Sequence, residues 1–337
     1  MAHRLDLNVK PDELKLGGEY TQYPSDYCAT AKNESGKINI GLAHIKGHRP
    51  SQEDEMKCSV NAVQLFKSLS YATRKLVLVR TFKELQEKYG QTEEGSTACI
   101  ATCWTDEKKT LHVTTANLGD SAAYLVITNR WKSSKVKRLN ELHKPTTPSE
   151  KARLDKEKAN VFFERLDGVL AVSRAFGDQA FEKNGLSHIP EVADCEIQLS
   201  AGQQAFVLVA CDGLDSLSLK MLGDIIAKNR NKTPAVIANT LIDKALAANS
   251  LDNISVACIP ISDLPANTPV SAAVFDGHGG DQVSRDVGEH FYDCLANHLS
   301  AVLQSDNTFS MGLFAAKNQS PQVIDEKINK RKACLIL

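Results

Sequence analysis

The sequence has no cysteine pattern that would indicate zinc or a disulfide framework. Its nine cysteines include no CxxC pair, and their number is odd. Small secreted domains that depend on disulfides carry dense, even sets of cysteines instead. The pattern therefore favours reduced thiols in a cytosol.

Long apolar runs and an excess of charge are also missing. No stretch approaches the ~18 consecutive apolar residues of a membrane span, and residues 1–15 show no apolar core of a secretory signal. Lysine and arginine total 40, against 41 aspartates and glutamates. Because a nucleic-acid-binding surface needs clustered positive charge, this balance gives no indication of such a partner.

The apolar pattern predicts a mixture of strands and helices in one large domain. Strand-like runs occur at 38–47, 98–104, 111–119, 122–128, 170–174, 205–213, 254–261 and 271–275, and helix-like patterns at 60–89, 234–248 and 283–302. Strands and helices do not alternate regularly, which favours antiparallel sheets with helices outside over a doubly wound parallel sheet. We expect an N-terminal arm over 1–36, a domain over 37–303 and a polar, basic tail over 304–337.

Acidic residues stand where several of these strands begin or end. They are Glu53, Asp54, Asp120, Asp212, Asp252 and Asp276. Each alone is explained by a turn, because aspartate commonly ends elements. However, the strand after Asp252 runs away from it and the strand before Asp276 runs back, so an antiparallel pair would bring both acids to one sheet end. Carboxylates gathered there need a cation, and oxygen ligands select Mg²⁺ or Mn²⁺ over zinc.

Motifs across residues 38–303 resemble those of the PPM family, the metal-dependent type 2C protein serine/threonine phosphatases. They are RPSQED (49–54), GSTA (95–98), NLGDS (117–121), HKP (143–145), LAVSRAFGD (170–178), ACDG (210–213), DNIS (252–255) and DGHGG (276–280). The resemblance implies an α+β fold in which two antiparallel β-sheets pack as a sandwich with helices on the outer faces.

The order of these motifs departs from the family. In the family, DGHGG follows the strand after the RxxxED motif, whereas here it comes after DNIS. We interpret this as one strand–helix unit moved to the C-terminal end, which gives a rearranged strand order. The linker PISDLPANTPV is long enough to join neighbouring strands, because extended chain reaches about 3.3 Å per residue.

The resemblance implies a set of metal ligands. Asp276 would bridge two Mg²⁺ or Mn²⁺ ions, and Asp212 and Asp252 would complete the first. Glu53 and the backbone carbonyl of Gly277 would serve the second.

Two further acids have less direct roles by the same resemblance. Asp54 would act through a metal-bound water, and Asp120 would hold a third, weaker ion. That third site also requires an acid four residues after Asp212, where this sequence has Ser216, with Asp215 one place earlier. The resemblance therefore does not decide whether a third ion binds.

Two side chains resemble the family's groups for the substrate. Arg49 matches the phosphate-binding arginine, whose planar fork suits two phosphate oxygens. His278 matches the general acid that protonates the departing serine or threonine alkoxide, with Asp276 beside it at the reacting centre. No nucleophilic side chain is needed, and the sequence contains no CxxxxxR loop of a cysteine-dependent phosphatase.

These residues predict a metal-dependent protein serine/threonine phosphatase that hydrolyses phosphoserine and phosphothreonine with water activated at a binuclear metal site. Its partners would be phosphoproteins, and we expect a monomer. Two alternatives remain: a PPM-fold binding or scaffold protein that has lost catalysis, and a phosphatase for small phosphorylated molecules. The complete ligand set argues against the first, because gathered like charges cost stability without metal. The sequence does not discriminate substrate size.

The last four residues form a C-a-a-X pattern at Cys334. A terminal leucine favours geranylgeranyl transfer by a prenyltransferase of a eukaryotic cytosol. Basic residues precede the cysteine, namely Lys327, Lys330, Arg331 and Lys332. One lipid chain binds membranes marginally, and each nearby basic residue adds about 1 kcal/mol on an anionic leaflet. We expect peripheral attachment to the cytosolic face of a membrane, in a host cell if the source is a bacterium.

Cys334→Ser is predicted to move the full-length protein from the membrane to the soluble fraction of eukaryotic cells. Fractionation of tagged wild type and variant measures the difference. Identical partition of both proteins into the soluble fraction would show that the lipid anchor does not form, and activity in vitro should not change.

Overall fold

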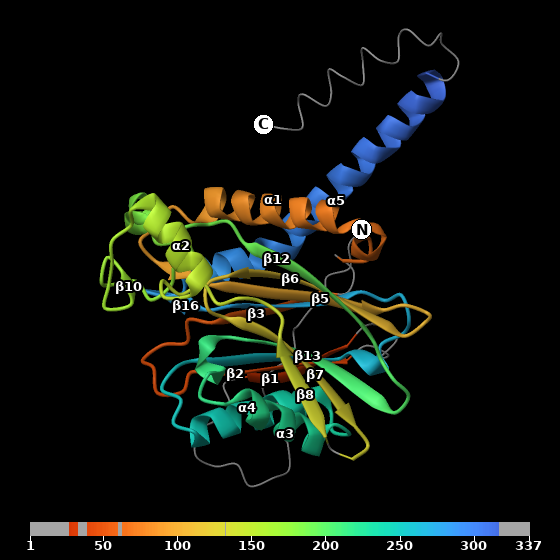
Figure 1. Ribbon diagram of the computed structural model, residues 1–337, viewed down its shortest axis with the longest axis horizontal. Coiled ribbons are helices and arrows are strands. Elements are labelled where there is room, and N and C mark those ends of the chain that lie inside the picture. The colour runs from red at the N-terminus through yellow and green to blue at the C-terminus, as the bar shows by residue number, and fades with distance from the viewer. Residues whose placement is uncertain (1–26, 33–38, 60–62, 132, 317–337) are drawn as a thin grey trace.

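The computed structural model describes residues 27–32, 39–59, 63–131 and 133–316 of the chain. Two antiparallel sheets lie face to face, with helices on both outer sides (Figure 1). This arrangement confirms the predicted sandwich of helix, sheet, sheet and helix layers. The predicted prenylation site at Cys334 lies outside the described residues.

The first sheet has six strands in the order β1-β2-β14-β13-β7-β8. Their bounds are Tyr27–Lys32 for β1, Asn39–Ile45 for β2, Ile254–Pro260 for β14, Gln203–Ala210 for β13, Ala122–Asn129 for β7 and Ser134–Arg138 for β8. β1 lies within the segment expected to be an arm, yet it pairs with β2 along its whole length. The sandwich therefore begins earlier than the expected boundary at residue 37.

The second sheet has five strands in the order β12-β6-β5-β15-β3. Their bounds are Glu191–Gln198 for β12, Thr110–Leu118 for β6, Ala98–Thr105 for β5, Val270–Phe275 for β15 and Glu55–Ser59 for β3. β15 lies between β3 and β5 and is antiparallel to both. The strand that leads into DGHGG is thus an internal strand of the sheet and not an appendage.

Two small sheets complete the strands. One joins β11 (Phe176–Gly177), β4 (Gly95–Ser96) and β16 (Gly277–His278), and the other joins β9 (Val161–Phe162) and β10 (Arg165–Leu166). Residues 170–174, which resemble a strand in the sequence, form only isolated bridges at Leu170 and Arg174. Their backbone runs between loops and has no continuous partner strand within the part of the chain that the structure describes.

Helices cover the outer faces of both sheets. α3 (Leu219–Asn229) and α4 (Pro234–Ala247) pack on the first sheet, and α1 (Tyr71–Tyr89) and α5 (Gln282–Ala316) pack on the second. α2 (Pro148–Glu157) lies beside the second sheet (Figure 1). Short 3₁₀ turns span Phe66–Ser68 (η2), Gln179–Asn184 (η3), Asp212–Leu214 (η4) and Ile261–Asp263 (η5). Ser70, Ser218 and Thr233 cap α1, α3 and α4, because each hydroxyl accepts a hydrogen bond from the first turn.

The hydrophobic core follows from this layering. Every residue of β5 and of β14 is buried, as expected for strands with both faces covered. One apolar cluster fills the space between the two sheets. A second lies between the second sheet and its helices, and a third lies between the first sheet and its helices.

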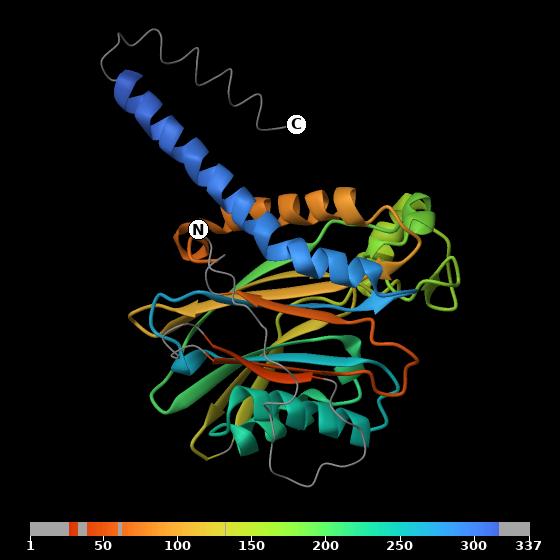
Figure 2. The same cartoon turned by 180° about the vertical axis from the view of Figure 1, so that it is seen from behind.

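α5 attaches the DGHGG segment to the helical layer. Its apolar stripe is at most 1% exposed at Val283, Val287, Phe291, Leu295 and Leu299. These side chains contact those of α1 and β15, which confirms the prediction that the helix packs on the outer sheet face. The helix continues past residue 303 to Ala316, and its far end projects beyond the sandwich (Figure 2). Among the described residues, no helix has the length and hydrophobicity that a bilayer crossing requires.

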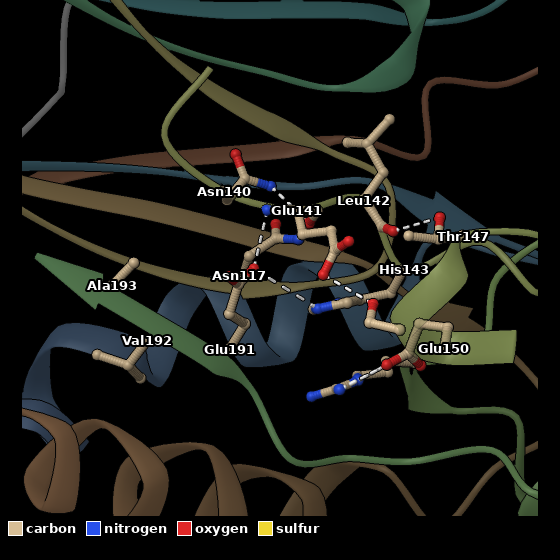
Figure 3. Close-up of polar contacts among 12 residues, drawn as sticks. Asn117, Asn140, Glu141, Leu142, His143, Thr147, Glu150, Glu191, Val192 and Ala193 are labelled. Atoms are coloured by element: carbon tan, nitrogen blue, oxygen red, sulfur yellow. Dashed lines mark hydrogen bonds and ion pairs between the residues drawn. The ribbon is translucent and has the colours of Figure 1, made fainter. Parts of the chain in front are cut away.

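A buried ion-pair network holds the loop that follows β8. Glu150 of α2 is 1% exposed and accepts hydrogen bonds from Arg153, Arg174 and Ser173. Burial would raise the pKa of Glu150, but these donors lower it to about 2. Figure 3 shows His143 beside Glu191, with 3.8 Å between Nε2 and Oε2. The Gly119 N–H donates to His143 Nδ1 at 3.1 Å, which holds the loop that carries Lys144.

Phe291→Ala is predicted to lower the free energy of unfolding of the whole domain by about 3–5 kcal/mol. The ring is fully buried and packs edge-on against Phe82, with 5.9 Å between ring centroids. Denaturant unfolding followed by far-UV circular dichroism measures the loss.

Glu289→Ala is the matched control, because Glu289 is exposed on the same helix and surface substitutions change stability by about 0.5 kcal/mol or less. If Phe291→Ala instead produced a separate transition that left the other strands folded, α5 and β15 would not be part of the cooperative unit.

Candidate active site

Two of the acids come from the first sheet. Asp212 follows β13, and Asp252 precedes β14. These strands are antiparallel neighbours, with Ala210 opposite Val256. Because one strand ends where the other begins, both acids lie at the same end of the sheet.

Three further acids come from the second sheet. Glu53 and Asp54 precede β3, and Asp276 follows β15. β3 and β15 pair antiparallel, with Glu55 opposite Phe275. The same reasoning brings Asp54 and Asp276 to one end of this sheet.

The expectation that the strands beside Asp252 and Asp276 pair with each other is wrong. β14 and β15 lie in opposite sheets, because the connection that contains η5 crosses from one layer to the other. The acids still meet, now across the seam between the layers. Asp276 experiences the charges of the other members of what we call the carboxylate cluster, defined as Asp54, Asp120, Asp212, Asp252 and Asp276.

The centre of the cluster is tightly packed. Donor atoms of Asp54, Cys211 and Asp276 lie within 4.8 Å of one another. The Ser255 hydroxyl donates to Asp54 Oδ2 at 2.6 Å, whereas the buried Asp54 Oδ1 has no hydrogen-bond partner among the described residues. The Cys211 thiol is engaged elsewhere, because it donates to the Asn253 carbonyl at 3.4 Å.

Burial and mutual repulsion raise the pKa values of the central carboxyl groups. Burial is the largest cause for Asp54, Asp212 and Asp276, and neighbouring carboxylates add to it. The charged forms are therefore unfavourable in the absence of a counter-charge. A divalent cation would reverse this effect.

Residues around Glu53 are held by backbone contacts. The Gly277 N–H donates to the Glu53 carbonyl at 3.2 Å, and a Cβ on Gly277 would lie 2.5 Å from that oxygen. Only glycine permits this approach. Asn253 accepts from the Glu53 N–H at 2.9 Å and donates to the carbonyls of Lys46 and Ser51, so it organises the preceding loop.

Arg49 lies on the exposed rim of the site. Its side chain is 51% exposed, and Nη2 pairs with Oδ2 of Asp252. The backbone N–H of Asn253 donates to the other Asp252 oxygen, Oδ1. The guanidinium is thus placed over the cluster and remains open to solvent on its other side.

His278 has a partner that the sequence did not indicate as a site residue. Its Nε2 lies 2.6 Å from Oδ2 of Asp178, a side chain that is 4% exposed. Burial lowers the pKa of His278, but the Asp178 hydrogen bond and charge outweigh this and raise it. A Cβ on Gly95 would lie 2.2 Å from both of these atoms, so that glycine makes the pair possible. Asp178 ends the LAVSRAFGD stretch, and its left-handed backbone (φ 53°) turns the side chain back to β16.

Asp120 is drawn toward a lysine. The Lys144 ammonium lies 3.4 Å from Asp120 and 4.0 Å from Asp215. Ser216 faces away, because its hydroxyl donates to the Ala245 carbonyl at 3.3 Å. Asp120 therefore already has a positive partner.

The residues present fit a hard divalent metal. The metal-binding atoms of the carboxylate cluster are oxygens, and their negative charge is in excess. Among the described residues, no donor reaches the buried oxygen Oδ1 of Asp54. Mg²⁺ and Mn²⁺ prefer such oxygen ligands.

Comparison with known proteins identifies the family of the chain. A family model described as Protein phosphatase 2C matches residues 28–254, which ends before DGHGG. The chain is 32% identical over 210 residues to the "Integrin-linked kinase-associated serine/threonine phosphatase 2C" of Bos taurus, covering 56% of this chain and 55% of that protein. It is 28% identical over 267 residues to "Protein phosphatase 1A" of Homo sapiens, covering 73% of this chain and 66% of that protein.

The fold has a counterpart among solved structures. The structure described as "Crystal structure of a phosphatase from a pathogenic strain Toxoplasma gondii" superposes with a TM-score of 0.52 at 22% identity, covering 70% of this chain and 96% of that chain. At this identity the likeness concerns the fold alone. The chain spans only about half to two thirds of the length of the two relatives named above. The family model nevertheless matches most of the sequence, and the chain belongs to the protein phosphatase 2C family.

Proposed function

We propose that the protein is a metal-dependent phosphatase that hydrolyses phosphoserine and phosphothreonine in proteins. The observation that carries this proposal is the carboxylate cluster at the seam of the sandwich, where Asp54 and Asp120 are buried and Asp212, Asp252 and Asp276 are half-buried. Family membership supports the reaction class. The printed names of the relatives support protein substrates.

Two Mg²⁺ or Mn²⁺ ions would be held by the ligands that the motifs suggest. Asp276 would be shared, with Asp212 and Asp252 on one side and Glu53 and the Gly277 carbonyl on the other. Bound there, the ions would supply a hydroxide at neutral pH and offset charge on the phosphoryl group. Asp54 would support the site from behind, since Ser255 already occupies one of its oxygens.

We propose two ions and not three. Lys144 supplies positive charge at Asp120 and Asp215, and a third cation would have to displace it. Ser216 offers a hydroxyl where a carboxylate would be needed, and that hydroxyl is bonded to Ala245.

Arg49 would bind the phosphate group. Its ion pair with Asp252 is at the solvent side, so the guanidinium can exchange that contact for two phosphate oxygens. The fork geometry of arginine suits such bidentate binding.

His278 would hold the proton that the departing alkoxide needs. The contact with Asp178 fixes the ring through Nε2 and favours the protonated form. Asp178 is then a positioning residue that acts through His278.

A screen of phosphopeptides and small phosphate esters in the presence of Mn²⁺ would distinguish this function from the two alternatives. A binding module would hydrolyse nothing, and a metabolite phosphatase would prefer small phosphate esters to phosphopeptides. The membrane tether is a separate proposal, which rests on the sequence of residues 327–337 and does not enter the chemistry of the site.

Hydrolysis of a phosphothreonine peptide is predicted to require added Mn²⁺ and to stop in EDTA. Asp212→Asn should lower the rate by more than the roughly 100-fold that loss of an outer metal-site contact can cost. Calorimetric titration should find two Mn²⁺ ions per wild-type chain, which tests the proposal against three.

Asp263→Asn is the matched control, because this exposed acid lies in η5 outside the cluster. It should retain the wild-type rate and stoichiometry. An undiminished rate in EDTA would rule out the metal-dependent reaction, and peptide hydrolysis much slower than that of small esters would favour the metabolite alternative.

His278→Gln is predicted to slow hydrolysis of a phosphoserine peptide by about 10²–10⁴-fold, the usual contribution of a positioned acid. The rate on p-nitrophenyl phosphate should fall far less, because its leaving group needs little protonation. Asp178→Asn should show the same selectivity with a smaller loss. Equal losses on both substrates would remove His278 from the role of acid.

A further inference from the structure

A second group of metal-binding side chains lies where α5 packs against α1, away from the carboxylate cluster. Cys294 and His298 are four residues apart on α5, so they project from the same face of the helix. Glu84 of α1 faces them. Donor atoms of these three side chains all lie within 4.8 Å of one another.

The helices are already held at this place by apolar contacts. Phe82 of α1 and Phe291 of α5 meet edge-on, and both are fully buried. The Cys294 thiol points toward the Thr81 carbonyl of α1 at 3.9 Å. Figure 2 shows the two helices running over the same face of the second sheet. The three donors therefore sit on a rigid scaffold.

His298 and Glu84 are close enough for an ion pair, but the contact lacks hydrogen-bond geometry. His298 Nε2 lies 2.9 Å from Glu84 Oε2. This nitrogen is nevertheless hidden from solvent and has no hydrogen-bond partner of acceptable geometry among the described residues. A buried ring nitrogen beside a carboxylate oxygen and a thiol is the arrangement that a shared metal ion would satisfy.

Glu84 is oriented by a neighbour. Lys88 Nζ lies 2.5 Å from its Oε1, so Oε2 is the oxygen that faces His298. Metal ligands are commonly oriented in this way by an outer contact. The Glu84 and His298 side chains are 30% and 22% exposed, which leaves access from solvent.

We propose that Glu84, Cys294 and His298 form a separate site for Zn²⁺, or a divalent ion of similar softness, that clamps α5 to α1. One sulfur, one nitrogen and one oxygen ligand suit zinc and are poor ligands for Mg²⁺. A thiolate and a carboxylate balance the charge of the ion, and the thiol proton passes to solvent on binding. Three protein ligands leave a fourth position for water.

The consequence is a metal-dependent attachment of the segment that carries Asp276 and His278. β15 and β16 lead directly into α5. Holding α5 to α1 would therefore stabilise the docking of this segment without touching the carboxylate cluster. This inference does not depend on the proposed phosphatase activity.

Cobalt binding provides the direct test. With the full-length protein in saturating Mg²⁺, one equivalent of Co²⁺ should produce a sulfur-to-cobalt charge-transfer band, which oxygen ligands cannot give. Zn²⁺ should displace the cobalt and abolish the band. Cys294→Ala should remove the band. His298→Gln should weaken Zn²⁺ affinity by more than about 100-fold, because loss of a group that only orients a ligand already costs up to roughly 100-fold.

Cys195→Ser is the matched control, because it removes a partly buried thiol elsewhere and should leave the band unchanged. Cys211→Ala separates the two clusters, since Cys211 lies beside Asp54 and Asp276. A band lost in Cys211→Ala but kept in Cys294→Ala would overturn the proposal, and so would the absence of any band in the folded wild type.

Amide hydrogen exchange supplies a second readout that does not rely on cobalt. Zn²⁺ should slow exchange within α1 and the part of α5 around Cys294, and Cys294→Ala should lose this protection while remaining folded in Mg²⁺. Unchanged exchange in the wild type at saturating Zn²⁺ would contradict the clamp.

Discussion

The pairing of β15 with both β3 and β5 is the constraint on which the candidate active site depends. It delivers Asp276 to the end of the second sheet, beside Asp54, and across the seam from Asp212. The position of this strand along the chain is secondary, because the site requires only that the strand occupy that place in the sheet. The apolar face of α5 fixes the strand there by packing on α1.

This arrangement stores electrostatic free energy in the metal-free protein. Like charges gather in buried and half-buried positions at the junction of two layers, and withdrawal from water is the largest cause of the raised pKa values of Asp54, Asp212 and Asp276. The sandwich tolerates the cluster because the apolar contacts between the sheets and under the helices are extensive. Local contacts also stabilise two of the carboxylates, because Ser255 donates a hydrogen bond to Asp54 and Lys144 forms an ion pair with Asp120. The remaining excess of negative charge is what a pair of divalent ions would offset.

The acids, the sandwich and the α5 stripe were all predictable from sequence, because strand-end position, motif and helical spacing are local signals. Contacts between segments far apart in the chain could not be predicted in this way. Nothing in the linker indicates that β14 and β15 join different sheets. Asp178 reaches His278 only through a left-handed backbone and a glycine at residue 95. The spacing of Cys294 and His298 is visible in the sequence, but Glu84 becomes their neighbour only when α1 and α5 pack.

We expect the carboxylate cluster to destabilise the metal-free protein and to stabilise the metal-bound one. The most direct test compares the free energy of unfolding of wild type and Asp276→Asn, at a pH that ionises the cluster. In EDTA the variant should be the more stable by about 1 kcal/mol, roughly the value of one pKa unit. With Mn²⁺ at 100 times its dissociation constant, wild type should gain about 2.7 kcal/mol and the order should reverse. A variant that is less stable than wild type by the same amount in both conditions would contradict the account.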